Sequence, residues 1–262
     1  TPGYMSVYCN DGFTLVEKLV QNVTGKSFPR FVQDEVFTPL GMSHSAYPLT
    51  PFADGTYAKC YTNSIPPTVP NPQKVVSTLA SGGLYSTPSD MAKFGVMLMN
   101  GGTYRGVRIL SRAAVNEMGK DQTLRSFCPV VSNECRYGLG WDSVTEPGLR
   151  AVGVTGWMKG GDSADYHAGI IVAPKVKLTA VVTGVAPISS TDCEKLAQRM
   201  SLRAMVDGGQ MRRMPAPLPS TPPKMKAATR AQLAAMTGVW AMYDAAYRIA
   251  ASAWSTFRDT YG

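Results

Sequence analysis

The sequence predicts an α+β fold in which helices come first, antiparallel strands follow and one helix closes the domain. Two observations predict it. Apolar residues recur at helical spacing near the N-terminus, and segments rich in Ile and Val lie between residues 166 and 186. Segregated helices and strands of this kind form an antiparallel sheet flanked by helices. With 262 residues, of which 44% are hydrophobic and 17% charged, the chain is long enough to bury such a core.

The first two predicted helices are bounded by clear signals. Asn10 or Asp11 is expected to cap the first helix, and Gly25 to end it. A second helix is predicted from Ser27, with proline in its first turn, and residues 38–42 end it. Leu15, Val16, Leu19, Val20 and Val23 recur at the spacing of one face of this first helix.

The middle of the chain alternates irregular and helical segments. Residues 43–71 are rich in proline and lack periodicity, so they form either an active-site wall or a surface excursion. Thr87-Pro88-Ser89-Asp90 is typical of a capping box with proline at the first helical position, and that helix is expected to end at Gly101. A shorter helix is predicted over residues 111–118.

The second half predicts the sheet. Strands are expected at residues 137–141, 149–155, 166–174 and 177–186. A last helix is predicted to begin at the capping-box pattern Thr191-Asp192-Cys193-Glu194 and to end near residue 208.

Composition divides the chain into three parts. Residues 1–210 form the main domain. Residues 211–232 form a basic linker with five prolines between positions 214 and 223, which makes it stiff and extended. Residues 233–262 are too short for a stable domain, and their pattern indicates the first strands of an incomplete, β-barrel-like domain.

Charge and cysteine content exclude several functions. The basic residues behind the net charge of +8 are scattered along the chain. The one segment with a local excess of basic residues has no aromatic residues between them, so no nucleic-acid partner is expected. No apolar run is long enough to span a membrane. The chain has five cysteines, two histidines and no C-x-x-C pattern, so neither a metal nor any other cofactor is expected. Cys128 and Cys135 bracket a short loop and are either a disulfide, which would indicate an oxidising compartment, or two free thiols.

Seven short motifs occur in an order that carries a family resemblance. They are Pro2-Gly3, Tyr8-Cys9-Asn10-Asp11-Gly12, Thr24-Gly25-Lys26, Pro39-Leu40-Gly41-Met42, Gly82-Gly83-Leu84-Tyr85-Ser86-Thr87, Tyr137-Gly138-Leu139-Gly140-Trp141 and Lys159-Gly160-Gly161. Over about residues 1–205 the ordered set resembles the β-lactamase-like serine hydrolases. These include class C β-lactamases, D-alanyl-D-alanine carboxypeptidases, D-aminopeptidases and family VIII esterases. The resemblance implies a β-lactamase/transpeptidase-like fold.

The resemblance also implies roles for particular residues. Tyr8 would relay a proton to the leaving group, and Asn10 would position the substrate amide. Lys159 would add positive charge from an edge strand and hold a substrate carboxylate. Gly161 would let the substrate approach the backbone, and the N–H of Asp162 would be one of the two oxyanion donors.

Three features depart from the family pattern, and one of them is Val154, where some relatives have a histidine. Gly160 stands where the family usually has threonine, which removes a hydroxyl expected near the substrate carboxylate. The nucleophile motif Ser-x-x-Lys is absent, because no lysine has a serine three residues before it. The nearest approximations end at Lys59 and Lys224 and begin with threonine. We therefore expect this chain to be the C-terminal part of a longer polypeptide, with a missing N-terminal segment or a second chain supplying the serine.

The expected function is hydrolysis of a small ester or amide, including D-amino-acid peptides, through an acyl-enzyme. A β-lactamase or D-Ala-D-Ala carboxypeptidase of the same fold is one alternative. A non-catalytic relative that binds peptides in the cleft is another. The expected location is periplasmic or extracellular.

Overall fold

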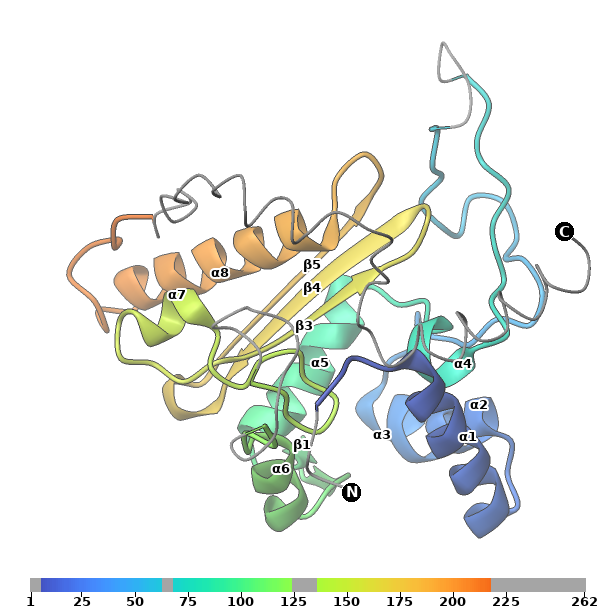
Figure 1. Ribbon diagram of the computed structural model, residues 1–262, viewed down its shortest axis with the longest axis horizontal. Helices are drawn as coiled ribbons and strands as arrows, with labels where there is room; N and C mark the ends of the chain where they lie inside the picture. The colour runs from blue at the N-terminus through green and yellow to red at the C-terminus, as the bar shows by residue number, and fades with distance from the viewer. Residues whose placement is uncertain (1–5, 63–67, 124–135, 218–262) are drawn as a thin grey trace, which may run out of the picture.

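A three-stranded antiparallel sheet lies at the centre of the protein (Figure 1). A computed structural model of the chain describes residues 6–62, 68–123 and 136–217. The strands are β3 (Trp157–Asp162), β4 (Tyr166–Ala173) and β5 (Leu178–Val185), in the order β3-β4-β5. Helix α8 (Ser190–Asp207) packs on one face and α5 (Pro88–Met99) on the other. The predicted α+β class, with an antiparallel sheet flanked by helices, is confirmed.

The N-terminal helices group together beside the sheet (Figure 1). Helix α1 (Asn10–Thr24) ends at Gly25, whose φ of 69° lies in the left-handed region. The cap differs from the prediction, because the Sγ of Cys9 accepts a hydrogen bond from the Gly12 N–H at 3.3 Å. Asn10 is therefore the first helical residue rather than the cap.

The second predicted helix is a continuous helical run with one wider turn. It consists of α2 (Phe28–Val32), the π-helical segment η1 (Gln33–Phe37) and α3 (Thr38–Leu40). Gly41, with φ of 65°, ends it as expected. The remaining short elements are α4 (Leu79–Gly82), β1 (Thr103–Tyr104), β2 (Val107–Arg108), α6 (Arg112–Met118), α7 (Pro147–Arg150) and η2 (Pro174–Val176).

Two predicted strands are wrong. Residues 149–155 begin in α7 and continue as turns, because the Glu146 carboxylate caps α7 by accepting from Gly148 N and Leu149 N. Residues 137–141 form a tight turn closed by an isolated bridge between Gly138 and Trp141. Gly140, at φ of 81°, makes that turn possible.

Helix caps account for where α5 and α8 begin. Pro88 is the first residue of α5, as predicted, and the Thr87 side chain accepts from Asp90 N. The reciprocal half of the predicted capping box is replaced, because the Asp90 carboxylate accepts from His44 N and Ser45 Oγ. Helix α8 begins earlier than predicted. Its cap is Ser189, which forms a reciprocal capping box with Asp192.

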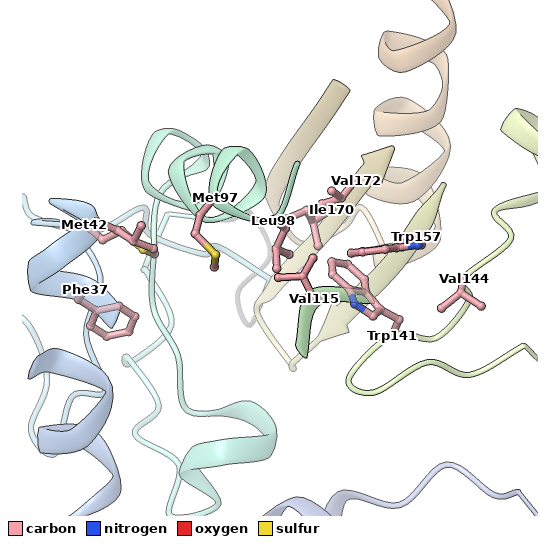
Figure 2. Close-up of a cluster of buried hydrophobic side chains, with 11 residues drawn as sticks. Phe37, Met42, Met97, Leu98, Val115, Trp141, Val144, Trp157, Ile170 and Val172 are labelled. Atoms are coloured by element: carbon pink, nitrogen blue, oxygen red, sulfur yellow. The ribbon is translucent and has the colours of Figure 1, made fainter. Parts of the chain in front are cut away.

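Apolar residues on alternate positions of β4 build two separate cores. Ile170 and Val172 face α5, in the cluster that Figure 2 shows, where the Trp141 and Trp157 rings lie 5.6 Å apart. Ile171 and Ala173 face α8. The sheet is therefore buried on both faces, and β3 and β5 are its two edge strands.

Several predictions fall outside the described residues. These are the Cys128–Cys135 pairing, most of the proposed linker and the proposed β domain at residues 233–262. They remain predictions. Among the described residues, Cys9, Cys60 and Cys193 are free thiols, and no helix is long and apolar enough to cross a membrane.

Helix α8 approaches the sheet closely at Gly169. A Cβ at this position would lie 2.7 Å from the backbone N of Glu194 and 2.8 Å from the backbone C of Cys193. Both contacts are with backbone, so α8 itself would have to move.

We expect Gly169→Ala to lower the free energy of unfolding by about 1–3 kcal/mol, because overpacking displaces α8. Urea unfolding measures the change. Gly82→Ala is the matched control, since a Cβ there meets nothing within 4 Å. Equal stability of Gly169→Ala and the control would contradict the close packing of α8.

Candidate active site

Tyr8 and Lys159, far apart in the sequence, meet at the edge of the sheet. The Lys159 ammonium lies 5.5 Å from the centroid of the Tyr8 ring, a cation–π arrangement. Tyr8 is 48% exposed. Lys159 lies on the outer strand of the described sheet, as the family resemblance implied.

Among the described residues, the outer edge of β3 has one open position, Asp162. Met158 N donates to Ser143 O at 2.7 Å, and Gly160 N donates to the Asp142 carboxylate at 2.9 Å, so the backbone groups of both residues point away from β4. Since this direction alternates along an antiparallel strand, the N–H of Asp162 points the same way. That direction is the one required of an oxyanion donor on this edge.

The two glycines of Lys159-Gly160-Gly161 face opposite sides of the sheet. A Cβ at Gly161 would contact only the Cβ of Ala168, at 3.9 Å, among the described atoms, so its face is open. A Cβ at Gly160 would meet the Glu194 carboxylate and Ser190 on α8. A threonine hydroxyl at position 160 would therefore point at α8. The glycine allows the helix to pack rather than changing the face that carries Lys159.

Asn10 is exposed at the start of α1, two residues after Tyr8. The structure thus places it on the element that begins at the site. Its predicted role in positioning a substrate amide remains a prediction, because that role depends on a ligand.

The side chain of Asp162 joins β3 to the N-terminus of α8. Its carboxylate accepts hydrogen bonds from Ser190 Oγ, from Ser190 N at 2.9 Å and from the His167 ring. The Ser190 hydroxyl, aided by His167 and the Ser190 N–H, holds the pKa of Asp162 below its usual value despite partial burial. Asp162 therefore has two separate parts: a backbone N–H at the edge and a carboxylate that fixes α8. His167 contacts this carboxylate from β4.

The irregular stretch at residues 43–71 is anchored beside this end of β3. Tyr166 donates from its hydroxyl to Ala58 O at 2.8 Å, and Asn71 donates to the buried Asp165 carboxylate at 2.6 Å. Burial raises the pKa of Tyr166 to about 12, so its hydroxyl stays a hydrogen-bond donor at neutral pH. Of the two interpretations left open for this stretch, these anchors favour a wall next to the site.

Sequence reasoning missed Asp142. Its carboxylate lies 3.1 Å from Lys159 Nζ and also accepts from Gly160 N. The one available signal was its position directly after Trp141 in the family motif. Within the described ranges, no group of three or more His, Cys, Asp or Glu side chains could hold a metal ion.

Comparison with known proteins decides the family. The profile of the Beta-lactamase family matches residues 1–192, which is most of the chain. The chain belongs to the Beta-lactamase family. This is a family of serine hydrolases.

Relatives and solved structures agree with that assignment. The chain is 28% identical over 150 residues to the D-alanyl-D-alanine-carboxypeptidase/endopeptidase AmpH of Escherichia coli K12, covering 53% of this chain and 35% of AmpH. The octameric penicillin-binding protein homologue of Pyrococcus abyssi superposes with a TM-score of 0.61 at 22% identity, over 79% of this chain and 44% of that one. The penicillin binding protein of Bacillus halodurans superposes with a TM-score of 0.57 at 20% identity, over 76% of this chain and 57% of that one.

These structural similarities confirm the predicted β-lactamase/transpeptidase-like fold. The chain spans about a third of the length of AmpH and less than half of the Pyrococcus protein.

The Asp162 carboxylate predicts a pH-dependent contribution to stability. Because the pKa of Asp162 is lower in the folded state, its charge stabilises the fold above the unfolded value near 3.8, and this contribution is lost as the pH falls through the folded pKa. Asp162→Asn should lower the free energy of unfolding by about 0.5–1 kcal/mol at pH 7, through the weakened interaction with the N-terminus of α8.

Urea unfolding at pH 7, 4 and 3 tests this prediction. The difference in the free energy of unfolding between wild type and Asp162→Asn should become smaller below about pH 4. Ser190→Ala is the companion variant, because it removes the main hydrogen bond that lowers the pKa. A gap that keeps its full size at pH 3 would show that the charge of Asp162 does not stabilise α8.

Proposed function

We propose that the protein hydrolyses a small ester or amide through an acyl-enzyme, with Tyr8 as proton relay, Lys159 as the positively charged group and Asp162 N–H as one oxyanion donor. D-amino-acid peptides are among the candidate substrates. The proposal is supported most by one observation: the Lys159 ammonium lies 5.5 Å from the Tyr8 ring beside an open position of the β3 edge.

Each group has a chemical task in acyl transfer. A tyrosine hydroxyl can carry the proton of the attacking serine to the leaving group. The Asp162 N–H, aimed outward from β3, can stabilise the oxyanion of the tetrahedral intermediate together with a second donor from the nucleophile's own backbone. The Lys159 ammonium favours the developing negative charge. Asn10 and Gly161 would orient and admit the substrate.

The nucleophile is proposed to come from a polypeptide segment outside these 262 residues, either a preceding segment or a second chain. The sequence has no Ser-x-x-Lys, and the chain spans only part of its relatives. Helix α1 offers a surface for such a segment. None of its residues is buried, and Leu15, Val16, Leu19 and Val23 are between 46% and 76% exposed. An apolar stripe of this kind usually packs against another element.

A peptidase acting on D-alanyl-D-alanine is the second candidate, favoured by the name of the relative AmpH. A periplasmic or extracellular location is proposed with it. A role limited to binding peptides is the alternative that the following experiment separates from hydrolysis.

Tyr8→Phe and Lys159→Met, made in the native protein with any associated segment, should each lower kcat/KM for ester and amide substrates by about 10²–10⁴-fold, as expected for loss of a proton relay or a charge at the reacting centre. Tyr104→Phe and Lys120→Met, which lie on β1 and just after α6, serve as matched controls. If both site variants hydrolyse at the wild-type rate, the proposed roles are wrong. If no form hydrolyses any substrate but peptides still bind, the binding role replaces catalysis.

A further inference from the structure

Asp142 contacts Lys159, the residue to which the family resemblance assigns the holding of a substrate carboxylate. Its Oδ2 atom lies 3.1 Å from Lys159 Nζ and 2.9 Å from the N of Gly160. The Asp142 backbone is fixed as well, because its N–H donates to Met158 O at 3.0 Å. The carboxylate is thus held between the strand backbone and the ammonium.

The contact changes the electrostatics of the site. The Lys159 and Asp142 side chains are 34% and 26% exposed, so the pair is partly shielded from water and its charges interact more strongly than on an open surface. Together they carry no net charge. A substrate carboxylate approaching Lys159 would gain one attraction and meet one repulsion at similar distance, whereas a neutral ester or amide would meet neither.

The same pair also occupies the backbone groups of Gly160. Asp142 accepts from its N–H, and the Lys159 ammonium donates to its carbonyl oxygen. Since Met158 is paired with residues 142 and 143, the first position of this edge without such a contact, within the part of the chain that the structure describes, is Asp162. Asp142 therefore defines both the charge beside the substrate and the point on β3 where a substrate can begin to pair.

We propose that Asp142 is a specificity-determining residue, which disfavours substrates with a free carboxylate next to the scissile bond and favours uncharged esters and amides. This inference rests on the proposed hydrolytic function and names its substrate class. It is a statement about substrate selection, and Asp142 takes no part in the bond-making steps.

The test compares two D-amino-acid dipeptides that differ only at the C-terminus, a free carboxylate in one and a carboxamide in the other. Wild type should hydrolyse the carboxamide with the higher kcat/KM. Asp142→Asn keeps the shape and an acceptor for Gly160 N–H but removes the charge. It should raise the carboxylate-to-carboxamide ratio of kcat/KM about tenfold, mainly through KM, as expected for a partly exposed charge pair.

Asp207→Asn is the matched control, because it removes one negative charge from the ion pair with Arg203 at the far end of α8. Its ratio should equal that of wild type. The inference is overturned if the carboxylate-to-carboxamide ratio of kcat/KM for Asp142→Asn lies within twofold of the ratios for wild type and Asp207→Asn, even if hydrolysis itself is normal.

A binding measurement separates this inference from the proposed function, because binding requires no nucleophile. N-acetyl-D-alanine and N-acetyl-D-alaninamide are titrated into wild type and Asp142→Asn, and the NMR signal of the Asp162 amide is followed. Stronger carboxylate binding by Asp142→Asn, with unchanged amide binding, supports the inference even where no hydrolysis occurs. Equal binding by the two proteins, or no binding of the carboxylate by either, overturns it.

Discussion

The packing of helix α8 against strands β3 and β4 is the constraint on which the candidate site depends. Gly169 permits direct contact between the β4 backbone and the backbone of α8, and Gly160 leaves the space that Glu194 occupies. The Asp162 carboxylate then ties the end of β3 to the first turn of α8 through Ser190. Because α8 and α5 cover the two faces of the sheet, strand backbone is left at the outer edges of β3 and β5, and α8 holds the β3 edge in place.

The geometry of the β3 edge explains how the short motif Lys159-Gly160-Gly161 can present several groups at one place. Alternation along β3 sends Met158, Gly160 and Asp162 backbone groups outward and the Lys159 side chain to the opposite face from α8. Residues 142 and 143 cover the beginning of this edge, and the segment before α1 brings Tyr8 over Lys159. The exposed apolar stripe of α1 starts a few residues beyond Tyr8. We propose that the segment carrying the nucleophile packs on that stripe.

Much of the fold was predictable because local signals and packing agree. Gly25 and Gly41 end helices at positive φ, Pro88 begins α5, and β4 and β5 alternate between two buried faces. Predictions failed where a helix cap or a turn residue determined the local structure against the apolar pattern of the sequence. Glu146 and Pro147 convert an apolar stretch into α7, and Gly140 turns an aromatic motif back on itself. The contacts of Asp142 with Lys159 and of Asp162 with Ser190 join residues on different elements, so no spacing in the sequence reveals them.

The central claim is that Tyr8, Lys159 and Asp162 form one part of a serine-hydrolase site whose nucleophile lies outside these 262 residues. The most direct measurement is the intact mass, under denaturing conditions, of the native protein after treatment with a serine-reactive fluorophosphonate. The account predicts an adduct on the serine of a Ser-x-x-Lys sequence in a preceding segment or an associated chain. An adduct on a serine within residues 1–262, or no adduct on any polypeptide present, would contradict it.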